Sequence, residues 1–312
     1  MKNMKTFIIL GAVILGLILL IIFRPTGQVN YSVPRLTKLD SSKITKVIIE
    51  KNNEKIELEK DSQNKWLIMP QGYPANQDTV KSLVNNAAGL EIMEFISDKG
   101  SYTPYELDDN KKILVTIYSG DDLARQFAVG KSSSTTSHSY VLLANDLKVW
   151  TAKGNLRVSY DQSSDEMRDK TIFNFQSDSI NEVLLEKGGK SVTLTKNIRK
   201  EKPEGSEEET EITEWISNKS NKAVDENTVR TQIIQSMSNL NCENYLEDKK
   251  VTDYNPADAS YTITLKGTKD YTLRFFDEKD SRYTAIASDN DYVFEIASWK
   301  ATNIMQDFSD WE

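Results

Sequence analysis

The chain has 312 residues, 38% of them hydrophobic and 9% aromatic, which predicts about two folded domains and excludes a disordered chain. Its net charge of −8 at pH 7 argues against nucleic acid as a partner, because an acidic surface repels phosphate. The single cysteine, Cys242, excludes an intrachain disulfide and a metal site built from several cysteines, and we expect it to be buried near a helix end.

Residues 6–23 (TFIILGAVILGLILLIIF) carry no charge. At about 1.5 Å per residue they form a helix of about 27 Å, close to the ~30 Å hydrocarbon core of a bilayer. A cleaved signal peptide has a shorter apolar run followed by a small-residue cleavage site, and the residues that follow offer no such site. The segment therefore predicts an uncleaved signal anchor, that is, one transmembrane helix.

The charges around this segment predict its orientation. Lys2 and Lys5 precede it, whereas only Arg24 follows closely, so residues 1–5 are expected in the cytoplasm and the bulk of the chain outside it. Residues 24–35 form a spacer that reaches at most about 40 Å. We therefore expect a single-pass protein of the cell membrane, with its folded part extracytoplasmic and close to the bilayer.

An internal repeat begins after the spacer. SSKITKVIIEK at 41–51 recurs as SDSINEVLLEK at 177–187, displaced by 136 positions. Each stretch continues into a second alternating strand through two residues, Asn52-Asn53 or Gly188-Gly189, and both pairs tolerate the positive φ that a tight hairpin requires. The pattern predicts two equivalent β-hairpins.

The correspondence continues with a tryptophan strand and an amphipathic helix. Trp66 matches Trp215, and Thr79 and Thr228 open the two helices, all displaced by 149 positions. The residues expected to cap these helices are Asp78 and Asn227. The longer displacement points to an insertion in the second copy.

Each copy then becomes rich in strands. A hairpin is expected to turn at Asn145-Asp146 and another near Asp289-Asn290, followed by helical tails over 155–169 and 299–308. This order predicts the α+β class. We expect an internal duplication with two tandem, similar antiparallel-sheet-plus-helix domains, at 36–175 and 176–312.

The insertion, at about 197–214, has seven glutamates between residues 201 and 214. Such a composition predicts a solvated, protruding loop. A calcium site would instead place Asp or Asn at alternating positions around a glycine, and this stretch does not.

The sequence offers only weak candidates for catalytic or ligand-binding residues. His138 lies among serines, but none occupies the strained turn of a catalytic serine, so an exposed loop is expected. Gly130-Lys131-Ser132 lacks the glycine of a phosphate-binding loop, since position 125 is Arg, and predicts a β-turn. Arg168-Asp169-Lys170 is interpreted as a charged helix end. The sequence assigns no catalytic, cofactor-binding or metal-ligating residue and no cofactor.

The tryptophans allow two interpretations. They could stack on sugars, but two of them recur at equivalent strand positions, which favours packing in the core. The residues concerned are Trp66, Trp150, Trp215 and Trp299.

Several short motifs along the chain resemble a known family. After the apolar segment come KWLIMP, TPYELDD, FAVGK and MRDKTIF, and together they are similar to the bacterial domain of unknown function 4340. The resemblance implies a membrane-anchored protein, often associated with ABC-type exporters or gliding-type transport systems. It implies no catalytic residue.

Two hypotheses of different class follow. The first is a non-catalytic accessory subunit of an ABC-type transport system, whose partners are the bilayer, through residues 6–23, and a permease or auxiliary membrane protein. The alternative is a glycan-binding protein of the cell envelope or a carboxylate-dependent envelope hydrolase.

Overall fold

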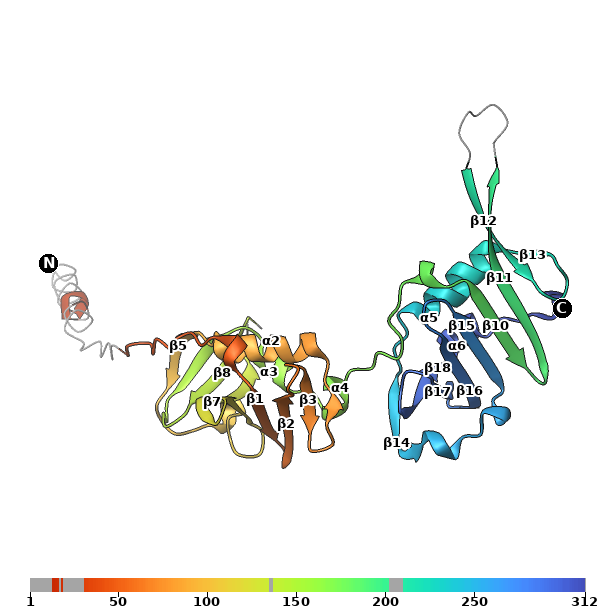
Figure 1. Cartoon of the computed structure of the whole chain (residues 1–312). Coiled ribbons are helices and arrows are strands. Elements are labelled where there is room, and N and C mark those ends of the chain that lie inside the picture. Colours follow the sequence, from red (N-terminus) through yellow and green to blue (C-terminus); the bar gives the residue numbers. More distant parts are fainter. Residues whose placement is uncertain (1–12, 17, 19–30, 135–136, 202–209, 312) are drawn as a thin grey trace, which may run out of the picture. The chain divides into compact units, whose positions relative to one another are not determined.

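The computed structural model describes residues 13–16, 18, 31–134, 137–201 and 210–311 (Figure 1). Most of the predicted anchor, residues 6–23, lies outside this part of the chain, and no helix within it is long and apolar enough to cross a bilayer. Residue contacts divide the chain into two compact units. The first unit holds the described residues up to Glu57 together with Ser82–Asp161; the second holds Leu58–Lys81 and the described residues from Gln162 onward.

The first nine strands form one antiparallel sheet in the order β4-β3-β2-β1-β6-β7-β8-β9-β5. Their bounds are β1 Lys46–Lys51, β2 Glu54–Lys60, β3 Trp66–Met69, β4 Tyr73–Pro74, β5 Ile92–Ser97, β6 Ile113–Ser119, β7 Asp122–Ser132, β8 His138–Leu143 and β9 Val149–Lys153. The helices in this part of the chain are η1 Ser41–Lys43, α2 Gln77–Ala88, η2 Thr103–Tyr105, α3 Leu156–Tyr160 and α4 Ser164–Met167.

The other nine strands form a second sheet in the order β13-β12-β11-β10-β15-β16-β17-β18-β14. Their bounds are β10 Glu182–Lys187, β11 Lys190–Glu201, β12 Thr210–Ser217, β13 Ala223–Val224, β14 Asn244–Lys250, β15 Tyr261–Lys266, β16 Tyr271–Lys279, β17 Arg282–Ala287 and β18 Tyr292–Ala297. The helices are η3 Ser177–Ser179, the π-helix η4 Thr228–Gln235, α5 Ser236–Ser238, η5 Val251–Asp253, η6 Pro256–Asp258, α6 Ser298–Ile304 and η7 Ser309–Trp311. Adding nine to each strand number of the first sheet gives the second, so the prediction of two similar antiparallel-sheet domains is confirmed.

The predicted hairpin turns are also confirmed. Asn52 and Asn53 have φ angles of 47° and 64°, and they join β1 to β2. Gly188 and Gly189 have φ angles of 57° and 79°, and they join β10 to β11. Different residues meet the same backbone requirement, because both Asn and Gly tolerate the left-handed region.

The two amphipathic helices begin earlier than predicted and are capped by other residues. Helix α2 begins two residues earlier than expected, and the side chain of Asn76, not Asp78, accepts a hydrogen bond from Thr79 N at 3.0 Å. In the second copy Asp225, not Asn227, accepts from Thr228 N at 2.8 Å. Both corrections have the same cause: the capping side chain must stand just before the first helical residue, which is Gln77 in the first copy and residue 226, directly ahead of η4, in the second.

The predicted helical tails are shorter than expected. The tail over 155–169 is broken into α3 and α4, because Ser163 forms a capping box with Glu166 and starts a new helix. In the second copy, α6 ends at Ile304, four residues before the predicted end at 308.

The acidic insertion is partly strand rather than loop. Pairing between β11 and β12 continues as far as Glu201 opposite Thr210, and Figure 1 shows the two strands running together beyond the rest of their sheet. Ion pairs of Arg199 with Glu214 and Glu201, at 2.9 and 2.8 Å, support this extension. Residues 202–209 lie outside the described part.

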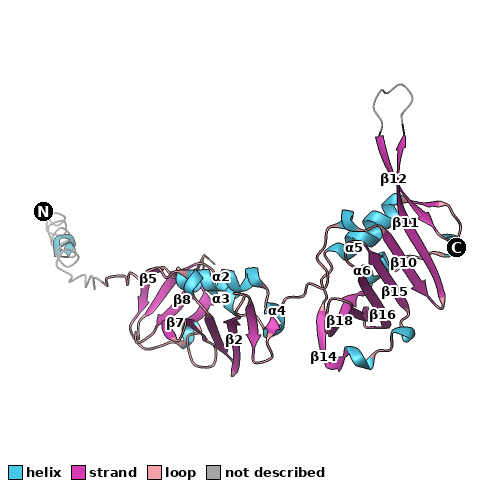
Figure 2. Cartoon of the chain, viewed as in Figure 1, coloured by secondary structure: helices cyan, strands magenta, loops and turns pink. Residues whose placement is uncertain are grey.

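Both faces of each sheet carry apolar side chains. Figure 2 shows helices gathered along one face of each sheet, and in the second unit α6 packs against η4 and α5. A smaller cluster on another part of the first sheet is built on Leu107, Ala128 and Val149. The second sheet has its own counterpart, built on Phe276, Ile286 and Val293.

Candidate binding groove

Residues 31–39, which begin within the predicted spacer 24–35, are held beside β5, the strand at one edge of the first sheet. The ring of Tyr31 stacks on Phe95 with centroids 3.6 Å apart, and the Tyr31 hydroxyl donates to Asp98. Leu39 N donates to the carbonyl of Ala88 at 3.0 Å, at the end of α2. The segment is therefore fixed at two points, and between them it forms no strand with β5.

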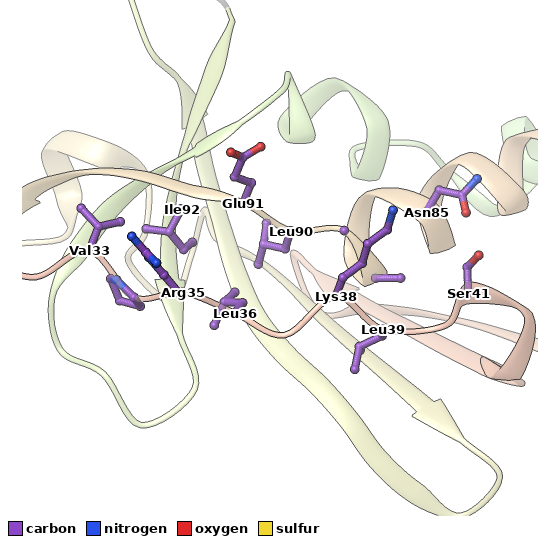
Figure 3. Close-up of a pocket in the computed structure, with 13 residues that line it drawn as sticks. Val33, Arg35, Leu36, Lys38, Leu39, Ser41, Asn85, Leu90, Glu91 and Ile92 are labelled. Atoms are coloured by element: carbon purple, nitrogen blue, oxygen red, sulfur yellow. The ribbon is translucent and has the colours of Figure 1, made fainter.

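An open groove lies at this place, with a volume of about 780 Å³, which is within the range of ligand-binding sites. We call it the N-terminal groove (Figure 3). Its lining residues are Val33, Pro34, Arg35, Leu36, Lys38, Leu39, Ser41, Asn85, Ala88, Gly89, Leu90, Glu91 and Ile92. Aliphatic side chains make up about half of this set, and the rest are polar or charged.

One half-buried cation, Arg125, lies at the end of α2. The guanidinium of Arg125 donates to the carbonyls of Ala87 and Ala88, at 2.7 and 3.1 Å, and also to that of Thr37. These carbonyls have no partner within the helix, and a cation suits the negative end of the helix dipole. Arg125 thus joins the helix to the N-terminal segment.

The groove carries two positive charges without ion-pair partners in the described part of the chain, on Arg35 and Lys38. In Figure 3 the side chain of Lys38 extends toward the helix that carries Asn85, whereas the carboxylate of Glu91 points away from the N-terminal segment. Glu91 pairs instead with Lys153, at 3.4 Å. A basic groove in a chain with a net charge of −8 favours a ligand that bears a carboxylate.

The second copy has different residues at the position that matches this segment. The 136-residue displacement maps Ile172 and Phe173 onto Leu36 and Thr37. The amides of Ile172 and Phe173 donate to Leu240 O at 2.7 and 3.2 Å, and both side chains are buried, at 4% and 1% exposure. In the first copy Leu36 is only half-buried and Thr37 is exposed. The second copy therefore buries an aromatic residue at the position where the first copy has an exposed threonine.

The sequence did not single out these residues, because it assigned 24–35 to a spacer and began a domain at 36. The signal that could have found them is a departure from the repeat. Where the second copy has Ile-Phe at 172–173, the first has Leu-Thr at 36–37.

His138 and the Gly130-Lys131-Ser132 stretch differ from prediction. His138 is the first residue of β8, paired with Lys153, and is half-buried rather than in an exposed loop. The hydroxyl of Ser137 is 2.9 Å from its Nδ1. Residues 130–132 belong to β7 rather than to a turn. The two stretches pair with each other, with Ser132 on β7 opposite Ser139 on β8.

Gly130 has a packing role that also explains two of the family-like motifs. A Cβ placed on Gly130 would lie 2.2 Å from the carbonyl oxygen of Tyr105 and 2.8 Å from Leu107 Cγ. The TPYELDD stretch therefore lies directly on FAVGK, and only glycine allows that approach. These two motifs therefore stabilise the fold by packing against each other.

The predictions for the four tryptophans have different outcomes. Trp66, Trp150 and Trp215 are buried as expected for the core, with exposures of 5%, 2% and 2%. Trp299 contradicts that interpretation, because 67% of it is exposed. Its position on the outer side of the short helix α6 explains the difference, since Ala301 and Ile304 supply the buried face.

The prediction for Cys242 is confirmed. It is 4% exposed, follows helix α5 and packs in the core of the second unit, where burial raises the pKa of its thiol to about 11.

Arg168 is not a solvated helix end. Within the second unit its guanidinium lies over the rings of Tyr73, Tyr245 and Tyr292, at 3.7, 3.9 and 4.7 Å from their centroids. Its Nη1 donates to Glu247 at 3.0 Å, and the residue is only 4% exposed. Three aromatic faces and one carboxylate replace part of the water that this charge loses, while its buried Nη2 has no hydrogen-bond partner among the described residues. We interpret the cluster as structural.

A family model described as a domain of unknown function (DUF4340) matches residues 66–262, which is more than half of the chain. A search of the curated proteins and a search of the solved structures each gave no match.

Proposed function

Because the chain belongs to the family of the domain of unknown function DUF4340, whose description names no activity, we propose a function from the residues themselves. The protein is a membrane-anchored, extracytoplasmic accessory subunit of an ABC-type transport system. It binds an extracytoplasmic segment of a membrane-protein partner in the N-terminal groove.

The observation that carries this proposal is the open groove of the first copy, compared with the buried Ile172 and Phe173 at the matching position of the second. Ile172 and Phe173 show that an extended segment with an aromatic residue fits against the end of the repeat helix. An equivalent segment from a partner would cover the exposed Val33 and the half-buried Leu36 and Leu39. A carboxylate on that segment would pair with Arg35 or Lys38.

Location supports a membrane partner. The groove begins at Val33, ten residues after the apolar run 6–23 ends. Ten residues span about 35 Å at most, so an anchor at 6–23 keeps the groove near the bilayer surface. Tethering raises the effective concentration of a membrane-bound partner. The transport class of that partner is inferred from the motif resemblance.

A photo-crosslinking experiment tests the proposal in intact cells. A photoreactive residue replaces Asn85, which is exposed and lines the groove, and in a control it replaces Lys131, which is exposed on β7 of the same unit. We expect crosslinks from position 85, and not from position 131, to a permease or auxiliary subunit of an ABC-type transporter. The double change Arg35→Glu and Lys38→Glu should abolish them, whereas Lys131→Glu should not.

Two results would overturn the proposal. One is the same set of crosslinked proteins from positions 85 and 131, because the partner would then not bind preferentially in the groove. The other is release of the full chain from membranes by alkaline carbonate, which would contradict the anchor at 6–23.

A further inference from the structure

An exposed tryptophan stands beside a second, separate pocket. Trp299 is 67% exposed, although tryptophan is among the residues that lose most water on folding. The pocket next to it has a volume of about 260 Å³, below the roughly 300–1,000 Å³ of drug-sized sites but large enough for one sugar ring. Its lining residues are Gln235, Ser236, Asn239, Leu240, Asn241, Trp299, Lys300, Asn303 and Ile304.

Most of the polar lining is uncharged and available for hydrogen bonds. Four side-chain carboxamides line the pocket, and within the described residues none of them is engaged in a hydrogen bond: Gln235, Asn239, Asn241 and Asn303. Each carboxamide offers two donors and one acceptor. The one charge in the lining, on Lys300, is paired with Glu243 at 2.6 Å.

An irregular helix places part of this lining. In the first copy α2 is a regular α-helix of 12 residues, whereas its counterpart in the second copy is the π-helix η4, which ends at Gln235. Wide turns of this kind are rare and are found frequently at functional sites. The departure from the repeat therefore coincides with the pocket.

We propose that this pocket binds a carbohydrate. The apolar face of one sugar ring stacks on the indole of Trp299, and its hydroxyl or N-acetyl groups bond to the carboxamides of Asn239, Asn241 and Asn303. A charged ligand fits poorly, because Lys300 is already neutralised and no other lining side chain is ionised. A purely apolar ligand would leave four carboxamides without partners, which costs free energy. A neutral sugar satisfies both the aromatic and the polar part.

The test uses the full chain in a detergent without a sugar headgroup. Neutral β-1,4-linked oligosaccharides of glucose and of N-acetylglucosamine are titrated by calorimetry, and acrylamide quenching of tryptophan fluorescence is measured with and without sugar. We expect binding by at least one series, and sugar should protect the exposed indole from acrylamide.

Substitutions of the lining residues test whether the sugar binds in this pocket. Trp299→Ala should raise Kd at least tenfold, and Trp299→Phe should raise it less, because a ring for stacking remains. Asn239→Ala with Asn303→Ala should also weaken binding. Ile198→Ala, at a residue of the same unit that is 55% exposed, is the control and should leave Kd unchanged.

The proposal is wrong if neither series binds at millimolar concentration, or if Trp299→Ala binds as tightly as the unchanged protein. Its failure is distinguishable from failure of the partner groove, because Arg35→Glu with Lys38→Glu should leave sugar binding intact.

Discussion

The guanidinium of Arg125 donates a hydrogen bond of 2.7 Å to the carbonyl oxygen of Ala87. The same group reaches the carbonyls of Ala88 and Thr37, so one side chain on β7 holds both the end of α2 and the N-terminal segment. One wall of the N-terminal groove therefore depends on a residue that does not line it.

Removal of this cation should loosen that wall. Arg125→Met keeps the apolar stem but removes the hydrogen bonds to the carbonyls of Ala87, Ala88 and Thr37, and hydrogen bonds to a charged group are worth about 1.5–3 kcal/mol. We expect a loss of stability on the order of 2 kcal/mol in denaturant unfolding, together with faster proteolysis between Tyr31 and Leu39. Arg125→Lys, which cannot reach three carbonyls at once, should recover only part of the effect. Unchanged proteolysis would contradict this role.

The Gly188-Gly189 turn predicts a steric penalty. Gly188 has a φ of 57°, where a β-branched side chain is strongly disfavoured. Gly188→Val should therefore cost on the order of 1–3 kcal/mol of unfolding free energy. Gly188→Asn is the matched control and should cost less, because Asn52 occupies the equivalent position with a φ of 47°. Equal melting temperatures for Val and Asn variants would rule out this explanation.

Gly130 makes a different prediction, because its restriction is contact rather than φ. An added methyl group would lie 2.2 Å from Tyr105 O, so Gly130→Ala must push the 102–107 segment away from the sheet. Overpacking of this kind costs typically about 1–3 kcal/mol. Thermal unfolding measures the loss, with Lys131→Ala as the neighbouring control. A Gly130→Ala protein as stable as that control would show that the segment moves freely.

Glu57 should make the stability of the folded protein depend on pH. Hydrogen bonds from the ammonium groups of Lys46 and Lys55 hold the pKa of Glu57 at about 2, against an ordinary value of 4.5. A lowered pKa in the folded state means stability that is present above pH 4.5 and is lost as the pH falls toward 2. The destabilisation caused by Glu57→Gln should therefore be largest at neutral pH and shrink below 4.5. Glu54→Gln controls for loss of a surface charge; a difference independent of pH would contradict the ion pairs.

Much of the fold could be predicted from the sequence, because many features occur in both copies of the internal repeat. Asn52-Asn53 and Gly188-Gly189 identified the same turn through different residues, and Trp66 and Trp215 identified the same buried strand position. The edge strands β5 and β14 were not predicted. Their side chains are mostly exposed or half-buried, so they lack the alternation that marks a half-buried strand.

The two candidate sites could not be predicted, for physical reasons. At the N-terminal groove Thr37 is exposed where Phe173 of the second copy is buried, and such a difference in contacts leaves no pattern in composition. Trp299 looks like any other tryptophan in the sequence, since exposure is decided by which side of α6 faces the core. Periodicity over seven residues is too short to decide that.

Cys242 has a practical consequence. It is the only cysteine of the chain, it is 4% exposed, and burial raises the pKa of its thiol to about 11. Thiol reagents attack the thiolate, so the native protein is nearly silent toward maleimides at neutral pH. A cysteine introduced at Asn85 or Ser236 would be the dominant labelled position, without any need to remove the natural one. Each pocket can therefore carry its own fluorophore or spin label in an otherwise unaltered chain.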